Sequence, residues 1–252
     1  MGEHTDIPWC HHTFNVVIGC TPVGPGCDNC YAERQAKRMH VKFGQDQPRK
    51  ELSEGYWKKP ILWETKAWRE GVRKRVFCGS MCDVFDNRIQ GHIRERLWYL
   101  IEQTPHLNWL LLTKRAPNIE RYLPLWSDSE NQATWEIENV WLGVTVEDRK
   151  HGLKRMEILK ESQATVRFLS IEPLLEDLGK LDLTGIHWVI VGGESGPHAR
   201  PMDRRWAESI RLQCIDQGVP FFMKQMSQAN QPKTFRSIDH FPGALCVRQF
   251  PT

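Results

Sequence analysis

Three cysteines lie close together near the start of the 252-residue chain, at Cys20, Cys27 and Cys30. Two prolines and two glycines separate the first cysteine from the second, which predicts an exposed turn rather than packed core. Cysteine thiolates at such short spacing are typical metal ligands. A closed structural zinc site or an ordinary iron–sulfur cluster takes four protein ligands. Three cysteines therefore predict a metal centre with one open position.

The other cysteines leave alternatives open for this centre. Cys10 could supply a fourth thiolate and close a zinc site, and Cys78 or Cys82 could do so from the next strand end. Zinc accepts thiolates readily, but a catalytic zinc usually has histidine or carboxylate among its ligands. A cluster held by three cysteines instead leaves one iron open to water, substrate or cofactor.

The composition is that of a soluble globular protein, with 40% hydrophobic and 26% charged residues. No apolar run approaches the roughly 18 residues of a membrane-spanning helix, and the polar, acidic N-terminus is unlike a secretory signal. We therefore expect a cytoplasmic protein without a membrane partner. Its eight cysteines should then be metal ligands or buried thiols rather than disulfides. A net charge of +3 does not by itself indicate nucleic-acid binding.

Short apolar runs recur along the chain and alternate with amphipathic helical patterns. The runs are Phe14–Ile18, Val76–Cys78, Trp109–Leu112, Val140–Val144, Val166–Ile171, Trp188–Val191 and Val219–Met223. Such continuous apolar strands are typical of parallel sheets covered by outer helices. The helical patterns are Ala32–Phe43, Arg88–Gln103, Arg149–Glu161 and Arg204–Gln217. We expect a single domain over residues 1–252, with a long connection at 44–75 and a C-terminal extension at 227–252.

Polar or charged residues follow each run. In (β/α) barrels the active site is built at the carboxyl ends of the strands, so this pattern predicts a complete or partial (β/α) barrel with one shared mouth. A doubly wound open sheet is the alternative, although it gathers polar groups mainly at a switch point. The predicted cofactor-binding residues are Ser80, Asp83, Thr113, Lys114, Glu147, Glu172, Gly193 and Glu194. The candidate cations are Lys114, Arg115, Arg200 and Lys224; the alternative role for these charges is a structural ring of ion pairs.

A three-cysteine loop directly after the first strand of such a barrel resembles the radical S-adenosylmethionine enzymes. In that superfamily the cysteines hold a four-iron, four-sulfur (4Fe-4S) cluster whose open iron binds the amino and carboxylate groups of S-adenosylmethionine. Reductive cleavage then yields a 5′-deoxyadenosyl radical that abstracts hydrogen. The spacing departs from the usual motif, because six residues and then two separate the cysteines instead of three and then two. The Gly-Gly-Glu sequence that normally follows the second strand lies here at residues 192–194, after the sixth run.

A second resemblance covers most of the chain and points to a phage and bacterial three-cysteine-motif family, described as radical-S-adenosylmethionine-like. The similar segments are Ile7-Pro-Trp9, Phe14-Asn15, Gly19-Cys20-Thr21, residues 25–32, Val144-Thr-Val-Glu147, Ser170-Ile-Glu172-Pro173-Leu174 and Val191-Gly-Gly-Glu194-Ser195-Gly196. The resemblance implies a radical enzyme with a 4Fe-4S cluster and S-adenosylmethionine, an electron donor such as flavodoxin or ferredoxin, and a partner protein. It also implies a mobile-element setting, in which a nucleic acid base or nucleotide is modified or repaired.

Basic residues and tryptophans alternate within residues 44–75. Trp57, Trp63 and Trp68 lie among lysines and could stack on bases, as aromatic residues do in single-strand grooves. Simple packing of this connection onto the barrel is the other interpretation. A zinc-stabilised nucleic-acid-binding module without catalysis is therefore the alternative function.

Overall fold

The computed structural model describes residues 2–124, 126–127, 133–134, 137–227 and 237–251. Seven strands of this part of the chain form one sheet in the order β1-β4-β5-β8-β9-β10-β11. Their bounds are His12–Phe14 (β1), Lys74–Cys78 (β4), Leu107–Thr113 (β5), Val140–Thr145 (β8), Val166–Ile171 (β9), Trp188–Gly192 (β10) and Phe221–Gln225 (β11). The pairs β1–β4, β4–β5, β9–β10 and β10–β11 are parallel. The predicted α/β class with parallel strands and intervening helices is confirmed.

The chain divides into two compact units by its internal contacts. The first unit comprises Met1–Pro22, Ala32–Leu142 and Ser162–Thr165, and the second comprises Val23–Tyr31, Gly143–Glu161 and Val166–Thr252. Cys20 therefore belongs to the first unit, and Cys27 and Cys30 belong to the second. The expectation of a single domain over residues 1–252 stays a prediction.

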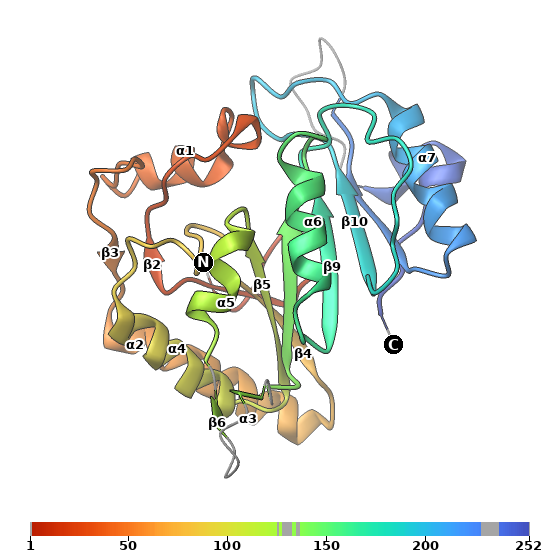
Figure 1. Ribbon diagram of the computed structural model, residues 1–252. Helices are drawn as coiled ribbons and strands as arrows, with labels where there is room; N and C mark the ends of the chain where they lie inside the picture. Colours follow the sequence, from red (N-terminus) through yellow and green to blue (C-terminus); the bar gives the residue numbers. More distant parts are fainter. Residues whose placement is uncertain (1, 125, 128–132, 135–136, 228–236, 252) are drawn as a thin grey trace. The chain divides into compact units, whose positions relative to one another are not determined.

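In the first unit, the segment expected as a long connection at 44–75 contains two helices that the sequence analysis missed. They are α2 (Glu54–Trp57) and α3 (Lys59–Glu70), and Figure 1 shows them grouped with α4 (Gly91–Glu102) below β4 and β5. Helix α3 buries Pro60, Trp63 and Ala67, whose spacing of three and four residues places them on one helical face. It ends at Gly71, whose φ of 64° is the left-handed conformation that glycine adopts readily.

The tryptophans of this segment have different environments. Trp57 and Trp63 are buried, with 6% and 5% of their surface exposed, whereas Trp68 is 64% exposed. Trp57 and Trp63 therefore pack in the first unit and are not available to stack on bases. Among the described residues, no helix is long and apolar enough to cross a membrane.

The predicted strand Phe14–Ile18 is two strands in the structure. β1 ends at Phe14, and β2 (Val17–Ile18) pairs antiparallel with β3 (Lys50–Glu51) in a separate sheet. Asn15 interrupts the run, because its buried side chain accepts a hydrogen bond from the Met81 amide (2.6 Å). It also donates one to Ser80 Oγ (3.0 Å). The predicted continuous strand was wrong at this point, because a side-chain hydrogen bond to a neighbouring loop replaces the ladder.

In the second unit, α6 (Gly152–Lys160) packs on β9, and α7 (Arg204–Asp216) packs on β10 and β11 (Figure 1). Gly143 lies in β8 against the Phe168 ring, and a Cβ there would come within 2.4 Å of that ring. The described part of the C-terminal extension returns to the sheet. Its residue Arg248 forms an antiparallel bridge with Phe222 of β11. Residues 228–236 of the predicted extension lie outside the described residues.

The remaining elements lie near their predicted positions or are short. α1 spans Tyr31–Lys37 and is shorter than the predicted Ala32–Phe43, while α5 covers Ile119–Tyr122. A small antiparallel pair joins β6 (Trp126–Ser127) and β7 (Ala133–Thr134). These elements do not contribute to the sites described below, apart from α1. This helix follows the segment of residues 20–30 that carries the three cysteines, which we call the cysteine loop.

We predict that His11 makes the protein less stable in mild acid. Burial, followed by the nearby Arg75 and Lys74 charges, lowers the pKa of His11 to about 4. Its Nδ1 accepts a hydrogen bond from the Arg75 amide (2.8 Å), which protonation removes. Because the folded-state pKa lies below the unfolded value of about 6.5, the stabilisation is complete above pH 6.5. It is lost as the pH falls towards 4.

The measurement is the melting temperature between pH 7 and 4 for the wild type and for His11→Asn, whose amide oxygen can accept the same hydrogen bond. The melting temperature of the wild type should fall further over this range than that of the variant. Equal slopes for the two proteins would contradict the assignment to His11.

Candidate functional site

The cysteines fall into two groups by exposure. Cys20, Cys27 and Cys30 are free and partly exposed, whereas Cys78 and Cys82 are buried. Burial raises the pKa of Cys82 to about 12 and that of Cys78 well above its usual value. Within the described residues, no group of three His, Cys, Asp or Glu side chains is arranged to hold one metal ion. The shared three-cysteine centre therefore stays a prediction.

In the first unit, Arg115 holds the start of the cysteine loop. It lies just beyond β5, and its Nη1 donates to Cys20 Sγ (3.6 Å) and to Asp83 Oδ2 (3.0 Å). Its Nη2 donates to the Thr21 carbonyl (2.7 Å). Burial and the Asp83 carboxylate raise the pKa of Cys20 to about 11, so the thiol is protonated at neutral pH until a metal displaces the proton.

Asp83 is fully engaged with protein groups. Its carboxylate accepts hydrogen bonds from Thr113 Oγ1 (2.8 Å), the Lys114 amide (3.1 Å) and the Phe85 amide (3.0 Å), besides that from Arg115. The predicted site residues Asp83, Thr113 and Lys114 are thus brought together, and they share contacts with one another. Ser80 contacts Asn15 instead. In this arrangement Asp83 and Thr113 orient Arg115.

A second arginine extends this network. The five N–H groups of Arg49 are all used: they bind Asp86 Oδ2, Thr21 Oγ1, and the carbonyls of Gly44 and Gln47. Arg49 and Asp86 form a buried ion pair at 2.7 Å. Asp86 also lies 3.7 Å from Arg115, so a continuous set of charges joins the Arg49 segment to Cys20.

In the second unit, Glu194 holds the other end of the cysteine loop. Its carboxylate accepts from Asn29 Nδ2 (2.8 Å), and from the amide (2.8 Å) and Nη2 (2.6 Å) of Arg200. Arg200 Nη2 also donates to the Pro25 carbonyl (2.7 Å). Burial acts to raise the pKa of Glu194, but the hydrogen bonds from Arg200 and Asn29 outweigh it and the pKa lies below its usual value. Glu194 therefore fastens the segment that carries Cys27 to the end of β10.

We predict that Glu194→Gln loosens this segment. The amide keeps an acceptor but loses the charge that Arg200 binds, and hydrogen bonds to charged groups are worth about 1.5–3 kcal/mol. Hydrogen exchange at the Cys27 and Cys30 amides, which donate within the loop, should become faster. Glu161→Gln, at an exposed position of the same unit, is the control. Unchanged exchange in Glu194→Gln would show that the contacts of Glu194 with Arg200 and Asn29 do not hold the loop.

Glu147 is completely buried at the end of β8, with 0% of its surface exposed. Its Oε2 accepts from Arg155 Nη1 (2.5 Å), but its Oε1 has no hydrogen-bond partner among the described residues. A Cβ on Gly26 would lie 3.1 Å from this oxygen, and one on Gly24 would lie 3.4 Å from it. The glycines of the cysteine loop thus allow its backbone to lie directly against a buried carboxylate.

Glu172 has a similar arrangement at the end of β9. Its Oε2 accepts a hydrogen bond from Lys224 Nζ, and its Oε1 is buried without a partner among the described residues. A Cβ on Gly192 would come within 3.2 Å of the Glu172 side chain. Gly193 faces protein, because a Cβ there would lie 2.3 Å from Ser227 Oγ. Of the predicted carboxylates, Glu147 and Glu172 therefore keep acceptor capacity that the described protein groups do not use.

Residues 4–244 match the family described as "Protein of unknown function (DUF5131)". The chain belongs to this family. No curated protein matches its sequence. The DUF5131 match spans nearly all of both units, including the three cysteines and every predicted strand end.

Two solved structures of spore photoproduct lyase share the fold. One is a double mutant with bound AdoMet and dinucleoside spore photoproduct, with a TM-score of 0.51 and 9% sequence identity over 95% of this chain and 72% of that chain. The other is a single mutant, with a TM-score of 0.50 at the same identity and coverage. This likeness confirms the predicted fold class, an α/β fold of parallel strands, and of the two predicted forms, a complete or a partial (β/α) barrel, it supports the partial one.

The sequence analysis missed several residues that position the predicted carboxylates and the cysteine loop within each unit of this DUF5131 protein. Asn29, between two of the cysteines, binds Glu194, and Arg155 in α6 neutralises Glu147. Asp86 follows Asp83 by three residues and binds Arg49. The Asp83–Asp86 spacing after a strand was a usable signal for this charge network. The Asn29–Glu194 contact joins residues 165 positions apart, and no local pattern indicates it.

Proposed function

We propose that this protein is a radical S-adenosylmethionine enzyme in which Cys20, Cys27 and Cys30 hold a 4Fe-4S cluster. The proposal is supported chiefly by one observation: the segments that carry the partly exposed thiols are each held by charged residues from strand ends. Arg115 binds Cys20 and Thr21 in the first unit. Glu194 and Arg200 bind Asn29 and Pro25 in the second. The shared fold with spore photoproduct lyase agrees with this assignment.

The donor set fits such a cluster in type, since three free, partly exposed thiols can supply the three protein ligands of a cluster with one open iron. When bound, the cluster would supply one electron to S-adenosylmethionine, and the reductive cleavage of this cofactor would give methionine and the 5′-deoxyadenosyl radical. Cys20 would lose its proton on binding, because its pKa is raised to about 11 in the metal-free protein.

The strand-end carboxylates would then divide between two roles. Glu172 is the carboxylate that we assign to the cofactor, because its unpartnered Oε1 can accept a hydrogen bond from an ammonium or hydroxyl group. Lys224 would hold this carboxylate in its orientation. Asp83 and Glu194 would act as positioning residues, because their oxygens are occupied by the arginines that hold the loop.

A nucleic acid base or nucleotide is the substrate that we propose. The lyase with the same fold was solved with a dinucleoside spore photoproduct, which supports a substrate of this class. An electron donor such as flavodoxin or ferredoxin would supply the reducing equivalent. The reducing cytoplasm, where such donors and free thiols coexist, is the compartment that we propose.

The decisive experiment is anaerobic reconstitution with iron and sulfide, followed by incubation with S-adenosylmethionine and dithionite. We expect a brown protein, broad visible absorption that bleaches on reduction, and 5′-deoxyadenosine in the products. Stoichiometric zinc without visible absorption would instead support a zinc-stabilised nucleic-acid-binding module. A cluster that forms without any 5′-deoxyadenosine would contradict the radical reaction.

A further inference from the structure

A cavity of about 320 Å³ lies in the first unit, between the segment around β3 and the start of α4. Ligand sites in proteins typically begin at about 300 Å³, so this volume suits one small ligand or one unit of a polymer. The cavity is lined by Gln47, Pro48, Arg49, Glu51, Asn87, Arg88, Gln90 and Ile93. We propose that it is a nucleotide-binding site in which Arg88 binds the phosphate. This site would bind the substrate class proposed above, and its role in catalysis rests on that proposed function.

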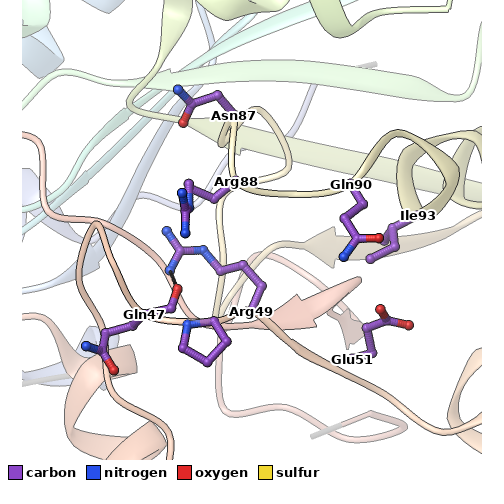
Figure 2. A pocket seen from close by; sticks show the side chains of 8 residues that line it. Gln47, Arg49, Glu51, Asn87, Arg88, Gln90 and Ile93 are labelled. Atoms are coloured by element: carbon purple, nitrogen blue, oxygen red, sulfur yellow. Dashed lines mark hydrogen bonds between the residues drawn. The ribbon is translucent and has the colours of Figure 1, made fainter.

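The two arginines of the cavity differ in what they can still bind. All five side-chain N–H groups of Arg49 are occupied by Asp86, Thr21 and two backbone carbonyls. Arg49 therefore lines the cavity in a fixed position and has no N–H group left for a ligand. The exposed side chain of Arg88 makes no hydrogen bond or ion pair with the rest of the described chain. Figure 2 shows its guanidinium beside that of Arg49, with the Glu51 carboxylate apart from both. Arg88 is therefore the cation available to an incoming anion.

The position of α4 adds to this preference for an anion. Gln90 directly precedes the 12-residue helix, and its side chain does not cap the first turn. The N–H groups of that turn carry partial positive charge, which favours an anionic group. Together with Arg88, they suit a phosphate better than a neutral ligand or a cation.

The other lining groups suit a nucleobase and its sugar. The side-chain amides of Gln47, Asn87 and Gln90 make no hydrogen bond within the described residues, and amides pair well with the donor and acceptor pattern of base edges. Pro48 and Ile93 supply apolar contact for a planar ring. The carboxylate of Glu51 can accept a hydrogen bond from a sugar hydroxyl or a base amino group.

The cavity is joined to the cysteine loop within the same unit. Its wall residue Arg49 binds Thr21 Oγ1 at 2.6 Å, directly after Cys20. Arg49 also pairs with Asp86, and Asp86 lies 3.7 Å from the Arg115 that contacts Cys20. A ligand bound against Arg49 would therefore contact the same network of charged residues that contacts Cys20.

The test is a fluorescence-anisotropy titration of a short fluorescein-labelled oligothymidylate with the full metal-free chain at low salt. Arg88→Ala should weaken binding by about tenfold or more, as expected for the loss of a charge-assisted hydrogen bond. It should also reduce the salt slope by about 0.7, the value for one phosphate contact to a single strand. Arg88→Lys should retain part of the affinity.

Arg69→Ala is the matched control, because it removes the same charge from an exposed position of α3 outside the cavity. It should bind as the wild type does. If Arg88→Ala binds no more weakly than Arg69→Ala, the inference is overturned. Circular dichroism checks that both variants are folded, and exposed Arg88 is not needed for packing.

Competition identifies the source of the nucleotide. Displacement by thymidine 5′-monophosphate would indicate a free nucleotide, and displacement only by unlabelled oligothymidylate would indicate a strand; either result supports the site. Displacement by inorganic phosphate at the same concentration as the nucleotide would overturn the nucleotide assignment. Because the titration uses metal-free protein, its failure leaves the cluster proposal standing. Failed reconstitution would equally leave this site standing.

Discussion

In the Cys27→Ala variant, anaerobic reconstitution is expected to leave essentially no bound cluster and no 5′-deoxyadenosine. The proposed centre has only three protein ligands, so the loss of one leaves two thiolates, fewer than the three or four that hold such a cluster. Iron content, visible absorption and product formation measure the effect. Cys27 is partly exposed, so its replacement should not disturb the core, and the melting temperature of the metal-free variant should match that of the wild type.

Two other cysteines provide controls for this prediction. Cys246→Ala removes an exposed thiol outside the loop and should retain the full cluster. Cys10→Ala tests whether the centre is closed by a fourth thiolate. A full iron content in Cys10→Ala is expected, whereas loss of metal there would show that Cys10 is a ligand and that no position is open.

The Arg155→Met variant is expected to lose about 3–5 kcal/mol of unfolding free energy, the usual cost of removing one partner from a buried ion pair. Glu147 is 0% exposed and Arg155 provides its Nη1 contact at 2.5 Å. Without this cation, a carboxylate with one oxygen already unpartnered would remain buried. Urea denaturation measures the change.

The double variant Glu147→Leu with Arg155→Met should be more stable than Arg155→Met alone, since both charges are then absent. Lys160→Met in the same helix is the matched control. Lys160 pairs with the exposed carboxylates of Glu157 and Asp182, and such surface pairs contribute about 0–1 kcal/mol. Equal losses in Arg155→Met and Lys160→Met would contradict the proposed burial cost.

The strands were predictable because their apolar runs are continuous. The prediction Val166–Ile171 coincides with β9, and Trp188–Val191 lacks only the last residue of β10. The ends were less predictable, because backbone pairing continues through polar side chains. Lys74 pairs with Leu107, for example, although its side chain gives no apolar signal.

Helix α3 shows where the pattern was present but was not used. Pro60 near its start, Gly71 at its end and the buried Trp63 and Ala67 are the expected signs of a helix. The many lysines and tryptophans of this segment are also typical of a nucleic-acid-binding segment, so its composition and its periodicity favour different interpretations.

The candidate site was predictable in its residue types but not in its contacts. The cysteine spacing and the polar strand ends make Cys20, Glu147 and Glu194 candidates without any structure, and their roles stay predictions. The use of each carboxylate depends on distant partners, such as Arg200 and Asn29 for Glu194. These contacts form only when loops separated by many residues fold against each other. Sequence patterns therefore could not separate the carboxylates that bind arginines from Glu172, whose Oε1 has no partner among the described residues.

The returning C-terminal segment has a consequence for solubility. The Met223 amide donates to the Val247 carbonyl, and the Gln249 amide donates to the Phe221 carbonyl, so residues 247–249 cover the outer edge of the last strand of the sheet. Uncovered edge strands are templates for pairing between molecules. A chain shortened before these residues would present apolar β11 to its neighbours, and the tail thereby protects the protein against aggregation.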